Sequence, residues 1–292
     1  MKTGFVVAML LLSCALCLGQ PDRAGLDSLK ATPEEIAPLK AVLDELWAKA
    51  QAQDTAGVTS LLHEKSAFWQ MQGPASAKLI HRDALAELLT ANPMPAGVTL
   101  GEAKAWISED VALIGAPLVG LPAEATGGRT TALGALMVQT AGQWQVVTAD
   151  LLDPALEQPT FEGDNPEDST AMQAAFREFQ QEMMARGASF LLESLEDEGV
   201  VVAWSDDEYR LIVTSPKELR WMLDQVAGLT LAPAADPQYF AVYGNGVAVM
   251  AATVDINAMG ASLQRRLILC TGYQPETGKW RLHAVAAVPN PE

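Results

Sequence analysis

The chain has 292 residues, of which 49% are hydrophobic and 19% charged; this favours two domains and excludes disorder over its whole length. Its 36 carboxylates outnumber 19 lysines and arginines, giving a formal net charge of −17 and no basic field for nucleic acid or an anionic membrane. The three histidines and three cysteines lack four-ligand zinc spacing, and no phosphate-binding loop, GxSxG or HExxH motif occurs. We therefore expect no metal, no cofactor and no nucleic-acid partner.

Residues 1–19 are predicted to be a signal peptide. Lys2 supplies a positive start, residues 5–13 form an apolar run, and small residues at 17 and 19 mark a cleavage point before Gln20. The run is too short to span a bilayer, which needs about 20 apolar residues. We expect a secreted or periplasmic protein without a membrane span.

The cysteines leave two alternatives open. Cys14 is the lipidated residue if the leader is instead that of a lipoprotein. After signal-peptide cleavage before Gln20, Cys270 is the one thiol of the mature chain, so no internal disulfide is expected. Cys270 lies in an apolar run, where we interpret it as a small buried hydrophobe, the alternative being a reactive thiol.

An acidic, proline-rich segment divides the mature chain. Residues 153–169 contain six carboxylates and three prolines but no basic residue, a composition typical of an extended linker. It separates a first predicted domain, 34–152, from a second, 170–289.

The two halves show a weak internal repeat. Trp144 corresponds to Trp280 and residues 111–114 correspond to 247–250, both at an offset of 136. Two blocks earlier in each half, 68–69 with 203–204 and 85–89 with 219–223, correspond at offsets of 135 and 134. We predict a duplicated domain, because four blocks at nearly constant spacing rarely arise by chance.

The first half is predicted to begin with helices. Apolar residues recur at helical spacing from Leu39 to Ala50, after a capping box and first-turn proline at 32–35. Further helices are expected at 55–63 and 82–90. Strands are expected at 66–71, 99–107, 111–119, 129–139 and 143–152.

The second half repeats this order. Helices are expected at 171–185, 189–196 and 216–226, and strands at 200–204, 209–214, 229–243, 247–256, 263–272 and 279–288. Helices followed by antiparallel strands indicate an α+β fold of two cone-shaped rolls, each with helices packed in a curved antiparallel sheet.

Four segments of the first half carry a family resemblance: 47–54, Phe68-Trp69, 80–85 and 142–150. With them the chain resembles the nuclear transport factor two-like superfamily, in particular its SnoaL-like and ketosteroid-isomerase-like members, over 34–152 and more loosely over 170–289. The resemblance implies a conical pocket between helices and sheet. It also implies pairing of the rolls, so that a monomer with an internal pseudo-dimer is expected. Two departures are His81, where the family usually has glycine, and Gly187, where the first half has Asp54.

Asp150 is the best candidate acid of the first half. Period-two alternation places it in phase with Trp144, so both are expected on one face of the last strand. We predict a ligand wall of Trp69, Trp106, Trp144 and Asp150. The alternatives are that Asp150 is a solvated strand end and that the tryptophans are ordinary core residues.

The second half offers other polar residues. Tyr239 and Tyr243 share a strand phase, and Asp255 lies on the next strand. His283 is out of phase with Trp280 and is expected outside any pocket that Trp280 lines; a metal site of His283 with Asp255 is a weak hypothesis.

These patterns favour a non-enzymatic binding module for a small apolar ligand or a partner protein. One alternative is a proton-transfer enzyme, such as an isomerase, cyclase or dehydratase, that uses a pocket carboxylate. Another is a structural protein whose rolls have filled cores. Fold alone does not decide among them.

Overall fold

The computed structural model describes residues 30–73, 76–92, 96–122, 130–161, 166–205, 210–223, 230–234, 239–258 and 261–289. The expected signal peptide at 1–19 lies outside these ranges. Within them, none of the helices combines the length and apolar character needed to cross a membrane.

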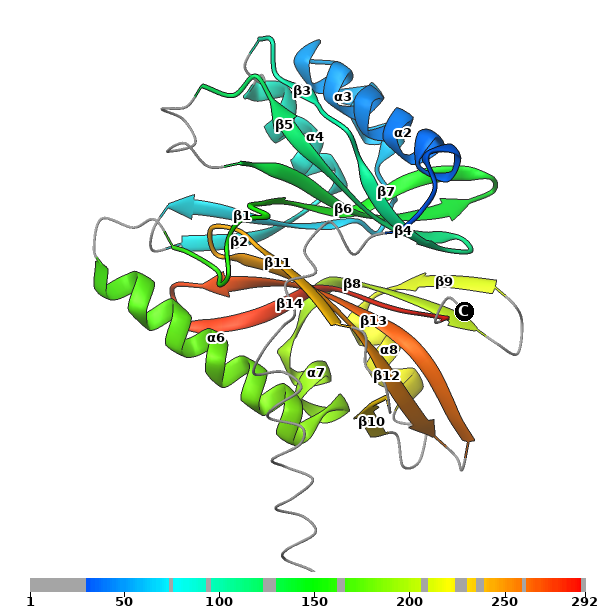
Figure 1. Cartoon of the computed structure of the whole chain (residues 1–292), viewed down its shortest axis with the longest axis vertical. Coiled ribbons are helices and arrows are strands. Elements are labelled where there is room, and N and C mark those ends of the chain that lie inside the picture. Colours follow the sequence, from blue (N-terminus) through cyan, green and yellow to red (C-terminus); the bar gives the residue numbers. More distant parts are fainter. Residues whose placement is uncertain are drawn as a thin grey trace, which may run out of the picture.

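Three helices cover one face of the first sheet (Figure 1). They are α2 (Pro33–Gln51), α3 (Thr55–Leu61) and α4 (Arg82–Ala91). The sheet has the order β3-β5-β6-β7, with β4 also paired to β5. Its strands are β3 (Thr99–Leu100), β4 (Lys104–Ser108), β5 (Val111–Val119), β6 (Ala132–Thr140) and β7 (Gln143–Leu152), and a separate hairpin joins β1 (Ala67–Gly73) to β2 (Ser76–His81).

The second sheet is larger and has its own helices. These are α6 (Pro166–Arg186), α7 (Ala188–Ser194) and α8 (Pro216–Leu223). The strand order is β10-β12-β13-β14-β8-β9, with β11 also paired to β12. The strands are β8 (Leu195–Ser205), β9 (Arg210–Thr214), β10 (Thr230–Pro233), β11 (Tyr239–Tyr243), β12 (Val247–Ala258), β13 (Ala261–Gln274) and β14 (Lys279–Pro289).

The predicted α+β class is confirmed, with local differences. β2 was not expected, because only Ile80 of its six residues is fully buried and its alternation is therefore weak. The expected strand 99–107 is two short strands, and 229–243 contains β10 and β11 as separate strands. β8 pairs with β14 in parallel, whereas the other strand pairs of the described residues are antiparallel.

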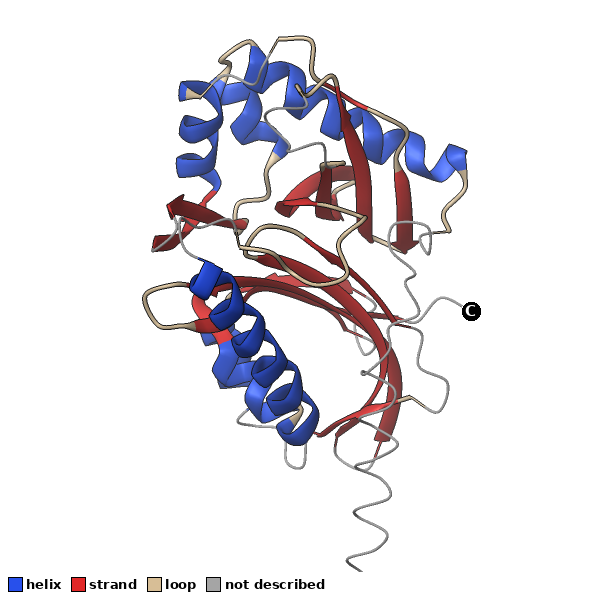
Figure 2. Ribbon diagram, turned by 60° about the vertical axis from the view of Figure 1, so that its left-hand side comes forward, coloured by secondary structure: helices blue, strands red, loops and turns tan. Residues whose placement is uncertain are grey.

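The sheets face each other, with a helical layer outside each (Figure 2). One apolar cluster lies between α2–α4 and the first sheet, and another lies between α6–α8 and the second sheet. A third cluster joins side chains of both sheets, including Leu113 and Val147 of the first and Ile268 and Ala286 of the second. Burial between the sheets therefore holds the halves together.

The segment expected to be a linker is partly attached to the second sheet. Asp153 is buried and its amide donates to the carbonyl of Tyr243 at 2.7 Å, while Thr160 bridges to Asn245. Phe161 packs into the second helical core, and α6 already begins at Pro166. An extended, self-repelling conformation is thus wrong for 153–161, because backbone pairing and the burial of Phe161 offset the repulsion of its carboxylates.

Candidate functional site

β7 contains a β-bulge at Val147. The register with β6 shifts between Leu136 and Met137, so Val147 is one residue more than the pairing needs. Val146 packs in the helix-side cluster, whereas its neighbour Val147 packs between the sheets. Because a bulge inserts one residue, the faces taken by odd and even positions exchange after it.

This exchange directs Asp150 away from the helices. Trp144, before the bulge, packs against the helix-side cluster. Leu152 has the phase of Asp150 and lies in the cluster between the sheets. The predicted common face of Trp144 and Asp150 is therefore wrong, since simple alternation does not continue through a bulge. Asp150 is also buried rather than solvated, with 6% of its surface exposed.

Two of the three predicted wall tryptophans lie on the same side as Asp150. Trp69 and Trp106 both pack between the sheets, so three of the four residues share that face and Trp144 does not. The Trp69 indole lies over the backbone of Gly272, where an added Cβ would come within 2.5 Å of the ring. The guanidinium of Arg266 lies 5.2 Å from the centre of the Trp106 ring, a cation–π contact.

The last hairpin of the second sheet has a bulge of the same kind at His283. The register of β13 with β14 shifts between Cys270 and Thr271. Leu282 packs on the helix side and Ala284 between the sheets. The imidazole of His283 stacks on the indole of Trp69 across the interface, with a centroid distance of 6.2 Å. His283 therefore also lies between the sheets.

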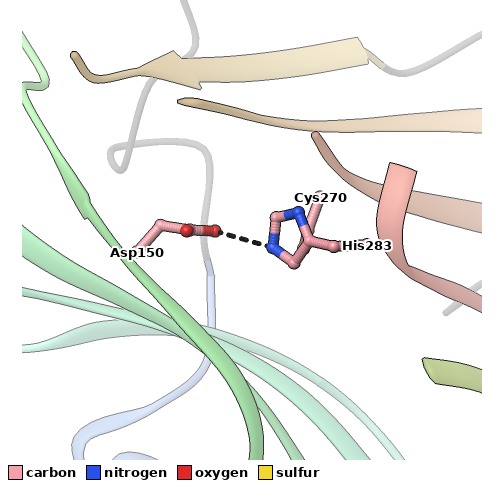
Figure 3. Close-up of side chains that lie close together, drawn as sticks. All are labelled: Asp150, Cys270 and His283. Atoms are coloured by element: carbon pink, nitrogen blue, oxygen red, sulfur yellow. Dashed lines mark ion pairs between the residues drawn. The ribbon is translucent and has the colours of Figure 1, made fainter. Parts of the chain in front are cut away.

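Asp150, Cys270 and His283 meet at this point (Figure 3). The Oδ2 atom of Asp150 lies 3.3 Å from Nε2 of His283, and one ligand atom of each residue lies within 4.8 Å of the other two. The exposed fractions of His283 and Cys270 are 0% and 1%. The carboxylate comes from the first half and the other two groups from the second.

The polar atoms of this cluster are not satisfied by the protein. Oδ2 of Asp150 and both ring nitrogens of His283 are buried without a hydrogen bond, since the 3.3 Å contact is not aligned as one. Leaving such a buried group unsatisfied costs about 1–3 kcal/mol. A native interior rarely concentrates three such atoms at one point, so this cluster needs an explanation beyond packing.

Nucleophilic catalysis does not explain the cluster. Burial raises the pKa of the Cys270 thiol well above its ordinary value, and the nearby Asp150 carboxylate raises it further. A nucleophilic cysteine needs a lowered pKa and access to substrate, and Cys270 has neither. The prediction that Cys270 is a buried residue agrees with its 1% exposure.

The structure does not assemble the acid and donor proposed for the second half. Tyr239 and Tyr243 pack in the helix-side core, where burial raises the pKa of both phenols. Asp255 follows Val254, which packs on that same helix side, so Asp255 points to the opposite face and pairs with Gln264. The two tyrosines and Asp255 therefore cannot act on one substrate.

An open groove lies elsewhere, along β9 and α8. Its volume is about 510 Å³, and its lining combines aliphatic side chains of β9 with polar side chains at the rim: Lys65, Leu211, Ile212, Val213, Thr214, Glu218 and Trp221. Trp221 is the most exposed of the large hydrophobic residues in the described part of the chain, at 69%. The sequence pattern predicted no role for Trp221, because no motif surrounds it.

The rim of the groove is polar and joins the two halves. Lys65 of the first half forms a 3.4 Å ion pair with Glu218 of α8. Glu218 also accepts hydrogen bonds from the Thr214 hydroxyl and the Ser215 amide. The Thr214 hydrogen bond is the largest of these effects, and together they lower the pKa of Glu218 to about 2.

Comparison with known proteins gives structural neighbours alone. No family model matches the chain, and no curated protein matches it. Three similar solved structures are a protein of unknown function from Mycobacterium tuberculosis (20% identity, TM-score 0.34, 42% of this chain and 73% of that one), an NTF2-like protein of unknown function from Silicibacter pomeroyi (14%, 0.34, 42% and 99%) and a putative scytalone dehydratase from Novosphingobium aromaticivorans (13%, 0.31, 41% and 83%).

Proposed function

We propose that this chain is an exported, non-enzymatic binding protein of two rolls of the nuclear-transport-factor-two-like kind, and that it binds a small apolar ligand in the groove beside Trp221. The observation that carries the proposal is the exposed indole at an open groove of about 510 Å³. Small-molecule sites are concave, mostly apolar and about 300–1,000 Å³ in volume.

The matching bulges support a duplicated roll. Val147 and His283 occupy the same place in the last hairpin of their sheets, at the repeat offset of 136. Helices α4 and α8 likewise each follow a two-stranded hairpin. Duplication of one ancestral roll, followed by divergence of the two copies, accounts for both similarities.

The position of Asp150 argues against the proton-transfer alternative. Such an enzyme needs a carboxylate directed into the cavity between helices and sheet. Asp150 points to the opposite side, toward His283 of the second sheet. Asp150 therefore does not reach a substrate held there.

The groove favours an apolar molecule of moderate size. Leu211, Ile212 and Val213 provide aliphatic wall, and the Trp221 indole provides a flat surface for stacking. The Lys65–Glu218 ion pair and the Thr214 hydroxyl are polar groups at the rim that fix orientation. A ligand that covers Trp221 removes an exposed indole from water, which is favourable.

Native mass spectrometry of the protein purified from its own host tests the proposal. We expect an adduct of a few hundred daltons on the wild type and on Leu263→Ala, a variant of another exposed apolar residue. Trp221→Ala should lose it. An adduct that persists in Trp221→Ala, or its absence from the wild type, overturns the proposed ligand site; a co-purifying polypeptide would replace the ligand by a partner protein.

Export is tested separately by N-terminal sequencing of the protein from the host. A mature chain that begins at Gln20 is expected from signal-peptide cleavage. A lipid-modified Cys14 would favour the lipoprotein alternative, and a chain that keeps Met1 would contradict export by either route.

A further inference from the structure

We propose that Asp150, Cys270 and His283 form a binding site for a zinc-type divalent metal ion that joins the two halves of the protein. The site is independent of the groove at Trp221 and goes beyond the proposed ligand binding. Its ligands come from β7 on one sheet and from β13 and β14 on the other (Figure 3).

The donor set suits zinc. Zn²⁺ binds thiolate sulfur, imidazole nitrogen and carboxylate oxygen at about 2.0–2.3 Å, and sites with three protein ligands keep a fourth position for water. The three donor atoms here lie within 4.8 Å of one another, and Nε2 of His283 and Oδ2 of Asp150 are already 3.3 Å apart. Side-chain movements of roughly 1 Å bring all three to a common ion with the distances of a zinc site.

Metal binding satisfies two of the three unsatisfied atoms. Oδ2 of Asp150 and Nε2 of His283 lack hydrogen bonds, and both would become ligands, while Nδ1 of His283 keeps the ring proton. The proton of the Cys270 thiol leaves to solvent when the ion binds, so the thiolate and carboxylate carry two negative charges. These balance the two positive charges of Zn²⁺, and the buried site is neutral, as a low-dielectric interior requires.

The site has a counterpart in which the two halves exchange roles, and that counterpart is apolar. The bulge residue His283 corresponds to Val147, and Cys270, which pairs just before the register shift, corresponds to Leu136. Asp150 lies three residues after one bulge and corresponds to Ala286, three residues after the other. All three counterparts are buried between the sheets, at 0%, 1% and 0% exposure. Packing of the sheets therefore does not require polar residues at this position, and their presence at one of the two places points to a ligand.

The experiment uses the full mature chain, because a sealed site must be filled as the protein folds. The protein is unfolded in urea with a chelator and refolded with Zn²⁺ or Co²⁺ alone. We expect one equivalent of bound metal, a near-ultraviolet thiolate-to-Co²⁺ absorption band, and a rise in Tm of about 5–10 °C at a hundredfold excess over Kd.

Three variants and a control assign the ligands. Cys270→Ser should lose the thiolate band, and Asp150→Asn and His283→Gln should weaken Zn²⁺ binding by at least about tenfold. His81→Asn is the matched control, because His81 also lies 3.3 Å from a carboxylate, that of Glu198, but on the surface. The control should bind as the wild type does.

The outcomes decide the proposal even where a variant folds poorly. Circular dichroism of each metal-free variant shows whether it has refolded. The proposal is overturned if the wild-type protein refolds but binds no metal. It is also overturned if Co²⁺ binds without a thiolate absorption band. Zn²⁺ binding that is unchanged in Asp150→Asn or His283→Gln overturns the assigned ligands. Retained or lost ligand at Trp221 does not bear on these results.

Discussion

The same corner of the fold is built twice in this protein, once from apolar residues and once from polar ones. In the first sheet the bulge residue is Val147, and in the second it is His283. Both lie buried between the sheets, and the backbone irregularity is the same. The backbone irregularity thus forms with either a valine or a histidine at the extra residue, so it does not depend on the imidazole.

The two halves also differ in the residues that they place at the contact between the sheets. Trp69 of the first half reaches across and lies on Gly272, and the equivalent position of Gly272 in the first sheet is Val138. A side chain at 272 would meet the indole, so the glycine and the tryptophan depend on each other. The halves are thus complementary at this contact rather than identical.

Removing Trp69 should have the largest effect on stability. Trp69→Ala deletes the indole that packs on Gly272 and stacks on His283, and we expect the free energy of unfolding to fall by about 3–5 kcal/mol. Urea denaturation measures this. Trp221→Ala, at an exposed indole, should change it by less than about 0.5 kcal/mol. Equal losses in the two variants would show that the halves do not depend on Trp69.

Giving the polar corner the residues of the apolar one should stabilise the metal-free protein. The triple variant Asp150→Ala, Cys270→Leu, His283→Val replaces unsatisfied buried groups by hydrophobic ones, and we expect a gain of about 1–4 kcal/mol in chelator. Asp150→Ala alone should be destabilising, because it leaves His283 buried without its partner. A less stable triple variant would mean that the polar residues already serve packing.

Helix capping distinguishes α4 from α8. α4 begins after His81, whose side chain does not cap the helix, whereas Ser215 and Glu218 form reciprocal hydrogen bonds at the start of α8. Ser215→Ala should lower the free energy of unfolding by about 1 kcal/mol. His81→Ala should lower it by less than about 0.5 kcal/mol, since its contact with Glu198 is exposed. Thermal unfolding of both variants tests this difference.

The same cap should give the second half its own dependence on pH. Because the folded pKa of Glu218 is lowered from 4.5 to about 2, its stabilising effect is full above about pH 4.5 and is lost as pH falls toward 2. Glu218→Gln should therefore reduce Tm near neutral pH and approach the wild type in acid. The equivalent residue of α4 is Ala84, so Ala84→Gln should not change the shape of the pH profile. A constant difference between wild type and Glu218→Gln would contradict the link to this carboxylate.

The sequence predicted the elements wherever a periodic pattern was long. α2 begins after the capping box at Thr32, as expected, and β5 and β7 have the predicted bounds 111–119 and 143–152. It missed β2, where burial is weak, and it predicted an extended linker at 153–169 because the acidic composition does not show that Phe161 packs into the second core. The composition of a segment indicates how well it is solvated on average, whereas the burial of one aromatic residue can attach the segment to a domain.

The sequence placed His283 off the face of Trp280, as the structure has it, but placed Asp150 on the wrong face of its strand. The role of Asp150 as a site residue stays a prediction. The meeting of Asp150 with His283 was not predictable. Simple alternation assigned Asp150 to the face of Trp144, and neither bulge is marked by a glycine that would reveal it.

Local periodicity and hydrophobicity are enough to predict the helices, the main strands, the α+β class and the burial of Cys270. The face that Asp150 takes, and its contact with His283 and Cys270, follow only from the folded chain. A bulge arises from the pairing of two strands, and a contact between sheets arises from the packing of the two halves. Neither can therefore be predicted from the spacing of residues along one strand.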